Sequence, residues 1–546
     1  MLNSLAALTL ISANLLFGWK RTLSYLRYFQ QEEYNNRRFS TWLRANRAYD
    51  RRGSLALAGT ALASFVAPGG IESLIIAIIA LFILWAIVAK LEGDPRKTGK
   101  IKLSMTPRAT KTAWLSWGLL AGIVTLPLWG LGCGCGHTTG SPLASPALFG
   151  IIGAQAVPFL LMVSTIILSP VEKRLQRSYR EDAERILREV DPFTIGITGS
   201  YGKTGAKAAL GELLSVTLGS TFWPKKSINT VMGITRTIRE SLRPHHKYAV
   251  IEMGAYNIGS IKRLCDFTPP KAALVTAVGI MHLERFGSPD NVYRAKSEIA
   301  QALPSTGILV CNGDSANARR MAAEHRRETT LLYGFDLTKG PLDVFATDIT
   351  FGLSGTSFVI HYKGDRYPGR TPLLGRPALL NALGAFAMAC ALGANPAYAV
   401  ACLANLTPVD NRLVLDPGPT VSYLRDAYNS NPTGFEAALE VLGSLPATRR
   451  ILVTPGMIEL GDLQYDENKR LAGLAAKVCD HIYVVGATNR DAILAGLAGA
   501  DYPSSKTFVV DSRDAAFSAL RERSAKGDLV LLENDLGDLH EGGVRF

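Results

Sequence analysis

The sequence predicts a group of transmembrane helices followed by two α/β domains, each built on a mostly parallel sheet. Two observations lead to this class. Apolar stretches of 13 to 21 residues recur through the first third of the chain. After residue 192, short apolar runs alternate with helical stretches, the pattern of a parallel sheet covered by helices on both faces. A chain of 546 residues is also too long for a single hydrophobic core.

Five apolar stretches form the predicted membrane region. They cover residues 2–17, 55–67, 71–89, 113–131 and 148–168. A helix needs about 20 apolar residues to cross the hydrocarbon core. The last three stretches fit this length and the first is marginal. The first could instead be a signal peptide, but it lacks a basic segment before it and is followed by Trp19-Lys20-Arg21, which favours a retained helix. The second is either a short span or a re-entrant arm, joined to the third by Pro68-Gly69-Gly70.

The charge distribution orients these helices. The whole net charge of +13 lies in residues 1–180, which contain 20 basic and 7 acidic residues. Basic residues gather in segments 20–53 and 90–112 and directly after residue 168, whereas residues 133–146 contain none. By the positive-inside rule the basic segments face the cytoplasm, the N-terminus lies outside, and everything after Ser169 is cytoplasmic. Because the excess charge flanks apolar stretches, we expect no nucleic-acid partner.

The predicted outer loop contains Cys133, Cys135 and His137. These residues form either a metal or redox site or a turn of small residues. Three candidate ligands without a second cluster favour the turn.

The remaining sequence divides into a linker and two domains. We expect about five membrane helices over residues 1–171, a charged linker helix over 172–191, a central domain over 192–408 and a smaller, Rossmann-like C-terminal domain over 409–546. The expected strands are 193–198, 248–253, 272–278, 307–311, 345–351, 357–362, 451–454, 482–485, 507–510 and 529–532. The expected helices include 203–218, 293–303 and a long one over 379–403.

A phosphate-binding loop follows the first of these strands. The segment consists of Thr198, Gly199, Ser200, Tyr201, Gly202, Lys203 and Thr204. An apolar strand, a glycine turn and a helix start direct backbone N–H groups toward one point, which suits a triphosphate. Lys203 would neutralise phosphate charge and the Thr204 hydroxyl would bind Mg²⁺. The central domain is therefore predicted to resemble a P-loop ATPase.

Chemically active side chains also follow the next strands. Glu252 ends the strand that is expected to lie beside the phosphate loop, and His282 and Lys296 follow the strand after it. Ligands of parallel sheets gather at the carboxyl ends of strands. Taken alone, Glu252 could be an exposed edge residue, His282 a structural histidine and Lys296 a solvated lysine.

Together these motifs resemble the Mur ligase family, and within it the MurF branch, from residue 193 to the C-terminus. The resemblance implies an ATP-dependent ligase that joins an amino acid or dipeptide to a carboxylate of a cell-wall precursor, and hence a protein of the bacterial inner membrane. It implies ATP and two Mg²⁺ sites, with Lys296 carbamylated by CO₂. It assigns metal binding to Thr204, Glu252, His282 and Lys296, and catalysis to Lys203, His282 and Lys296.

The resemblance also assigns nucleotide and substrate contacts. Nucleotide contacts fall on the phosphate loop and on Asn381, Arg412, Asp426, Tyr428 and Asn429. Substrate contacts fall on Asn229, Thr230 and Asn431. Pro377-Ala378 replaces the His-Asn pair that precedes the adenine-contacting asparagine in the family. The segment 456–461, Gly-Met-Ile-Glu-Leu-Gly, is similar to one in MurF.

The largest departure from the family is the membrane region, which stands where Mur ligases carry a soluble UDP-binding domain. The acceptor is therefore expected to be lipid-linked or polymeric, or else the helices only anchor the enzyme to the bilayer. A polyglutamate-type ligase is the alternative function. A P-loop transport or signalling ATPase is a third, although the five spans lack the charged residues that a transport path would suggest.

Overall fold

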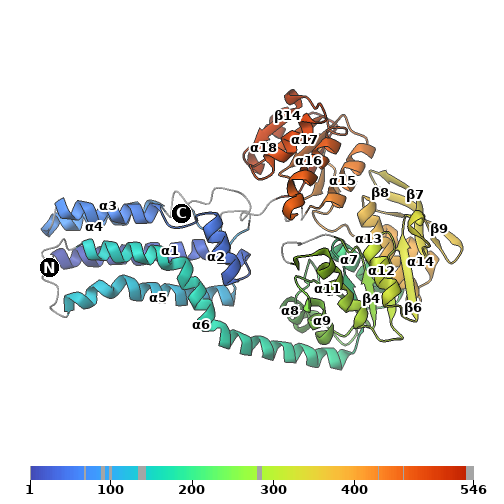
Figure 1. The fold of residues 1–546 in the computed structure, drawn as a ribbon, viewed down its shortest axis with the longest axis horizontal. Helices are drawn as coiled ribbons and strands as arrows, with labels where there is room; N and C mark the ends of the chain where they lie inside the picture. Colours follow the sequence, from blue (N-terminus) through green and yellow to red (C-terminus); the bar gives the residue numbers. More distant parts are fainter. Residues whose placement is uncertain are drawn as a thin grey trace. The chain divides into compact units, whose positions relative to one another are not determined.

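The computed structural model describes residues 2–66, 69–87, 93–97, 101–132, 143–279, 286–427, 430–458 and 460–535, with only the backbone for 127–132. The chain forms two compact units, one from Met1–Leu175 and one from Gln176–Asp535. The first unit is helical, and the second holds two sheets with their helices (Figure 1).

The helical unit is a bundle of long apolar helices. Its elements are α1 (Leu2–Gln31), α2 (Asn36–Ala45), α3 (Arg52–Val66), α4 (Gly70–Ala86), α5 (Pro107–Gly132) and the first part of α6 (Ala144–Val190). One apolar cluster joins α1 to α2, α5 and α6, and a second joins it to α3, α4 and α6. Large apolar side chains also remain exposed on the outside of the bundle, for example Leu62, Phe82 and Ile166. Exposed apolar surface of this kind marks a contact with another protein or with a membrane.

The described part of each predicted apolar stretch is helical, although the stretches 55–67 and 71–89 continue into residues outside the described ranges, and not every helix is long enough to span a membrane. Among the described residues, α1 and α6 have the length and composition of membrane spans, whereas α3 and α4 are shorter. Two such helices alone are weak evidence, because a buried core helix or a signal sequence would pass the same test.

The bundle encloses one ion pair that the sequence pattern does not reveal. Arg21 of α1 lies 2.6 Å from Asp50, and both side chains are fully buried. Asp50 also accepts hydrogen bonds from the backbone and the hydroxyl of Ser54, and Gln155 of α6 donates to the same hydroxyl. Buried charges are costly unless they are paired in this way, so this network ties α1, α3 and α6 together.

The larger sheet of the second unit has nine strands in the order β2-β3-β1-β4-β5-β6-β7-β8-β9. They are β1 (Phe193–Thr198), β2 (Thr221–Phe222), β3 (Tyr248–Glu252), β4 (Ala272–Val275), β5 (Ile308–Asn312), β6 (Thr329–Gly334), β7 (Val344–Gly352), β8 (Gly355–Tyr362) and β9 (Asp365–Thr371). The strands from β2 to β7 pair in parallel, and β8 and β9 add an antiparallel edge.

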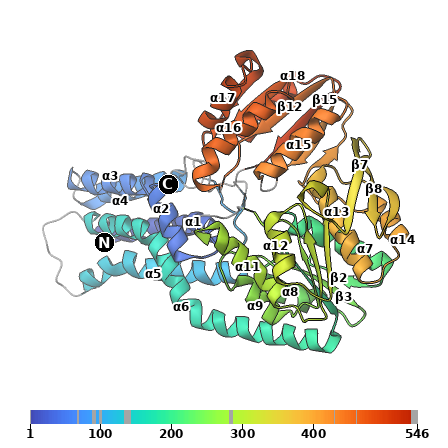
Figure 2. The same ribbon diagram turned by 45° about the vertical axis from the view of Figure 1, so that its right-hand side comes forward.

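Helices cover both faces of this sheet (Figure 2). One apolar cluster contains α7 (Lys203–Thr217), α13 (Arg376–Ala391) and α14 (Pro396–Cys402). The other contains α8 (Val231–Ser241), α9 (Ser260–Phe267), α11 (Pro289–Gln301) and α12 (Ala316–Glu324). The end of α6 belongs to the second cluster, because Ala183 is fully buried there and Ile186, Leu187 and Val190 pack against it. This part of the predicted linker helix is therefore part of the core of the larger unit.

The smaller sheet has six strands in the order β10-β11-β15-β12-β13-β14, all parallel except the β10–β11 pair. The strands are β10 (Val414–Asp416), β11 (Val421–Asp426), β12 (Arg449–Thr454), β13 (His481–Val485), β14 (Thr507–Val510) and β15 (Asp528–Glu533). Its helices are α15 (Pro432–Ser444), α16 (Gln464–Ala475), α17 (Arg490–Ala498) and α18 (Arg513–Arg523). The prediction of two mostly parallel sheets is confirmed.

Some elements differ from the sequence prediction. Strands β2, β6, β9, β10 and β11 were not predicted. The last four are only partly buried, so they lack the continuous apolar run that marks a central strand. The single helix expected over residues 379–403 is wrong. Gly393 has a φ of +98°, and Asn395 caps a new helix that begins at Pro396.

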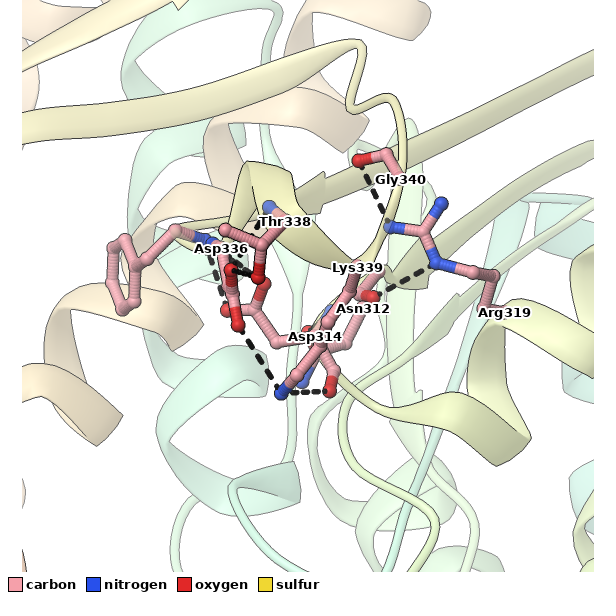
Figure 3. A network of polar contacts seen from close by, with 9 residues as sticks. Asn312, Asp314, Arg319, Asp336, Thr338, Lys339 and Gly340 are labelled. Carbon is pink, nitrogen blue, oxygen red and sulfur yellow. Dashed lines mark hydrogen bonds and ion pairs between the residues drawn. The ribbon is translucent and has the colours of Figure 1, made fainter.

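A polar network closes the carboxyl ends of β5 and β6 (Figure 3). The Asp314 carboxylate accepts the backbone N–H groups of Phe335 and Asp336, at 2.9 and 3.0 Å. Arg319 donates to the carbonyls of Gly313 and Gly340. The acceptors of this network are thus engaged by neighbouring backbone and side chains, which fits a structural role.

Candidate active site

The phosphate loop connects a central buried strand to a helix. β1 lies between β3 and β4, and α7 begins at Lys203. Gly202 is the N-cap of α7 and has a φ of +81°, a conformation that favours glycine. The first N–H groups of α7 have no partners within the helix, so they can bind an anion.

Hydrogen bonds attach this loop to the segment after β4. The Ser200 hydroxyl donates to the Gly279 carbonyl at 2.8 Å, and its backbone N–H donates to the Ala277 carbonyl at 2.5 Å. The Thr276 hydroxyl donates to the Tyr201 carbonyl. Burial raises the pKa of the Tyr201 phenol to about 12, so it stays neutral. The loop is thus held in its conformation by the protein itself.

Glu252 lies beside this loop and is almost fully buried. Its Oε2 accepts from the Thr204 hydroxyl and from Lys207 Nζ, each at 3.0 Å. Its Oε1 accepts from Asn229 Nδ2 at 3.1 Å. The structure thus brings together Thr204, Asn229 and Glu252 from the predicted site and adds Lys207, which was not predicted.

Two lysines, the buried Lys296 and the partly buried Lys203, meet at the carbonyl of Gly199. Lys203 Nζ and Lys296 Nζ each donate to that oxygen at 2.8 Å. Burial lowers the pKa of Lys203; Glu252 opposes this effect and Arg412 adds to it. Burial, with the Lys203 charge as a second cause, lowers the pKa of Lys296 well below its usual value. The environment therefore favours a neutral, nucleophilic amine at Lys296.

These groups border a small pocket. It is lined by Ser200, Lys203, Asn229, Gly254, Ala255, Tyr256, Phe286 and Lys296. The phosphate loop contributes Ser200 and Lys203 to this lining, and Phe286 contributes an apolar ring. A small anionic group would meet hydrogen-bond donors here.

Asn381 of α13 lies against the start of α7. A Cβ atom at Gly205 would lie 2.7 Å from Asn381 Nδ2, and one at Gly202 would overlap Asn381 Oδ1. A side chain at either glycine would therefore force the Asn381 amide to shift. Thr198 donates its hydroxyl to the Met253 carbonyl at 3.0 Å, which fixes the end of β1.

Arg412, which lies just before β10, interacts electrostatically with residues of both sheets. Its positive charge lowers the pKa values of Lys203 and Lys207 and opposes the rise at Asp426. Burial raises the pKa of Asp426 to about 6. Glu533, fully buried on the neighbouring strand, has a pKa raised well above its usual value by burial and by Asp426. Arg412 and Asp426 thus lie within electrostatic reach of each other.

Two other predicted residues cap helices, and the rest lie outside the described residues. Thr230 caps α8 and accepts the N–H of Gly233 at 3.3 Å, and Asn431 caps α15 and accepts the N–H of Gly434 at 3.0 Å. The residues outside the described part of the chain are His282, Tyr428, Asn429, Cys133, Cys135 and His137.

Sequence reasoning missed Lys207, Ser227 and Glu533. Lys207 follows Lys203 by one helical turn, so the spacing could have placed it on the same face of α7. The Ser227 hydroxyl lies 3.1 Å from that of Thr204. The places of Ser227 and Glu533 in the site result from contacts between distant segments, which the sequence does not show.

The oxygen donors present fit Mg²⁺. The Thr204 hydroxyl and the Glu252 carboxylate lie within 3.0 Å of each other. Both are hard oxygen ligands, the type that Mg²⁺ prefers. Within the described ranges, no group of three or more His, Cys, Asp and Glu side chains forms a separate metal cluster.

Known proteins share this architecture. Residues 197–389 match the Mur ligase middle domain, and residues 411–533 match the Mur ligase, glutamate ligase domain. The UDP-N-acetylmuramoyl-tripeptide–D-alanyl-D-alanine ligase of Escherichia coli (strain K12) is 32% identical over 314 residues, covering 56% of this chain and 68% of that protein. The ligase of the same name from Bacillus subtilis (strain 168) is 29% identical over 363 residues, covering 65% and 76%.

Solved structures agree with these matches. MurF from Acinetobacter baumannii superimposes with a TM-score of 0.58 at 27% identity, covering 66% of this chain and 77% of that one. MurF from Thermotoga maritima in complex with ADP has a TM-score of 0.56 at 24% identity, covering 66% and 80%, and shows the shared fold. The chain therefore belongs to the Mur ligase family as an ATP-dependent ligase that forms C–N bonds, MurF-like in its middle and C-terminal domains, with a helical region in place of the usual N-terminal domain.

Proposed function

We propose that this protein is a membrane-anchored ligase that adds an amino acid or dipeptide to a carboxylate of a cell-wall precursor. The observation that carries the proposal is the convergence of Lys203, Thr204, Glu252 and Lys296 around one loop, in a chain that begins with apolar helices. The relatives are named as ligases of a UDP-N-acetylmuramoyl tripeptide and D-alanyl-D-alanine, and these names support this class of amine and acceptor.

The reaction follows from the chemistry of amide formation. A carboxylate oxygen of the acceptor attacks the γ-phosphorus of ATP, and ADP leaves. The amine of the second substrate then attacks the acyl-phosphate carbon, the C–O bond to phosphate breaks, and the amine loses a proton. Lys203 and the N–H groups of α7 would stabilise the negative charge that builds up as two anions approach. The pocket lined by Ser200, Lys203 and Lys296 would hold the acyl phosphate beside these donors.

The remaining site residues take the following proposed roles. Thr204 and Glu252 would hold one Mg²⁺, and His282 with carbamylated Lys296 a second, which would help to neutralise the phosphate charge. Nucleotide contacts would come from the phosphate loop, residues 198–204, and from Asn381, Arg412, Asp426, Tyr428 and Asn429. Substrate contacts would come from Asn229, Thr230 and Asn431.

The burial of Lys296 supports its carbamylation. Only a neutral amine attacks CO₂, and the environment of Lys296 favours that form. The new N–C bond releases one proton and converts a potential cation into an anion, a suitable ligand for Mg²⁺. The hydrogen bond to Gly199 places this nitrogen next to the phosphate loop.

We further propose that the helical region spans the bacterial inner membrane, with the N-terminus outside and the ligase in the cytoplasm. Exposed apolar side chains on the bundle and the basic segments 20–53 and 90–112 support this arrangement. The boundaries would be 1–171 for the membrane region, 172–191 for the linker, 192–408 for the central domain and 409–546 for the C-terminal domain. A lipid-linked acceptor would be presented at the inner leaflet.

Release of phosphate from ATP by the detergent-purified protein tests this function. The assay would pair D-alanyl-D-alanine or single amino acids with a lipid-linked or a UDP-linked muramoyl peptide. We expect phosphate release that needs both amine and acceptor and that is at least tenfold faster with the lipid-linked one. Equal rates would show that the helices only anchor the enzyme, glutamate-dependent chain extension would indicate the polyglutamate alternative, and acceptor-independent ATP hydrolysis would contradict a ligase.

A further inference from the structure

Lys207 is a buried cation whose contacts join three separate segments of the active site. It lies on α7, and its side chain is only 1% exposed. Its Nζ lies 3.0 Å from Glu252 Oε2, at the end of β3. The same nitrogen donates to the carbonyl of Lys226 at 2.5 Å, in the turn that leads to Asn229.

These contacts fix the orientation of the Glu252 carboxylate. A carboxylate has about four acceptor positions, two on each oxygen. Thr204 and Lys207 occupy those of Oε2, and Asn229 occupies one on Oε1. Three donors in different directions leave the carboxylate a single orientation.

The turn at residues 225–229 is held by the same lysine. Lys226 has a φ of +60°, so this turn has an uncommon backbone conformation. Ser227 lies 3.1 Å from the Thr204 hydroxyl, and Asn229 bonds to Glu252. The contact from Lys207 to the Lys226 carbonyl therefore stabilises the turn at the point where it meets the phosphate loop.

We propose that Lys207 is a positioning residue for the metal-bound nucleotide. It holds the Glu252 carboxylate, and through it the Thr204 hydroxyl, in the arrangement that binds Mg²⁺. This inference rests on the proposed function of the site. It assigns Lys207 a role distinct from that of Lys203, because Lys203 donates to the loop carbonyls whereas Lys207 bonds to the carboxylate.

Nucleotide binding tests this role separately from ligation. The affinity for a fluorescent ATP analogue would be measured by titration of the full-length protein, in excess Mg²⁺ and in EDTA. The variants are Lys207→Met, Glu252→Gln and the double variant. Lys226→Gln is the matched control, because that side chain is exposed and in the same turn, and only its backbone carbonyl contacts Lys207.

We expect Mg²⁺ to increase the affinity of the wild-type and Lys226→Gln proteins for the fluorescent ATP analogue. This gain should fall at least about tenfold in Lys207→Met, the usual effect of removing a group that orients a metal ligand. Affinity in EDTA should change less than twofold. The double variant should be no weaker than Glu252→Gln, because Lys207 acts through that carboxylate.

Several results would overturn the role. The first is a Lys207→Met protein whose nucleotide affinity rises with Mg²⁺ as much as that of the wild type. The second is an equal loss of nucleotide affinity with and without Mg²⁺. The third is a double variant that binds the nucleotide markedly more weakly than Glu252→Gln. If Lys207→Met does not fold, the nucleotide affinity of the double variant tests the role, since its neutral pair leaves no unpaired buried charge. A double variant that also fails to fold would show that the role of Lys207 is purely structural. A wild-type protein without Mg²⁺-dependent nucleotide binding would instead contradict the proposed function itself.

Discussion

Lys296 donates a hydrogen bond to the carbonyl of Gly199 at 2.8 Å, although the two residues are separated by 97 positions in the sequence. This contact joins α11 to the phosphate loop and places a buried amine next to Lys203. Two adjacent positive charges, one on Lys203 and one on Lys296, would repel each other, so one of the two amines must be neutral or modified.

Replacement of Lys203 by alanine should abolish ATP turnover. The ammonium group would no longer stabilise the charge on the transferred phosphate, a loss that we estimate at 100-fold or more, roughly the effect of removing one such donor. Amine-dependent phosphate release measures the effect, and circular dichroism checks that the helices remain folded. Lys262→Ala, at an exposed position on α9, serves as the control. Robust ligation by Lys203→Ala would refute the site.

Replacement of Lys296 by alanine should remove most activity, and short carboxylic acids should restore part of it. The added acid would supply the anionic group that the carbamate provides in the wild-type protein. Activity is compared with and without added acid, with Lys203→Ala as the variant that should not recover. A fully active Lys296→Ala enzyme would exclude the carbamate.

Removal of residues 176–192 should destabilise the ligase unit. Ala183 is fully buried in its core and three larger apolar side chains of α6 pack beside it. Burial of one such side chain contributes about 1.5–3 kcal/mol when complete, so we expect a loss of roughly 3 kcal/mol for these partly buried ones. Urea unfolding of chains that begin at Gln176 and at Phe193 measures the difference. Equal midpoints would show that α6 is only a tether.

Stability of the smaller sheet should depend on pH through Asp426 and Glu533. Burial raises the pKa of Asp426 from 3.8 to about 6, so the folded form binds more protons than the unfolded form between these values. The contribution of protonated Asp426 to the free energy of unfolding is therefore complete below about pH 4 and is lost as the pH rises through 6. Glu533, whose pKa is raised further, extends the loss to higher pH.

Thermal unfolding of the nucleotide-free protein between pH 5 and 8 checks this dependence. Glu533→Gln should unfold at a higher temperature than the wild type at pH 8 and show a flatter profile, because a neutral amide has no proton to lose. Glu436→Gln is a suitable control, since that carboxylate is largely exposed. A profile of Glu533→Gln parallel to that of the wild type would mean that Glu533 does not control the dependence.

The local features of the ligase unit could be read from the sequence. β1 occupies the predicted residues and α7 begins at Lys203, because an apolar run, a glycine turn and an amphipathic helix depend on neighbouring residues. The position of Glu252 at the end of a buried strand follows in the same way. Apolar runs also marked the long helices of the first unit, although not the short polar helix α2, since side-chain composition alone shows where a chain avoids water.

Tertiary structure decided which of these features meet. The Lys207–Glu252 pair, the approach of Asn381 to Gly202 and the register of Asp426 with Glu533 all join segments far apart in the chain. Such contacts depend on strand order and helix packing, which no local pattern records. For the same reason the half-buried strands β10 and β11 and the buried Arg21–Asp50 pair became visible only when their neighbours were in place.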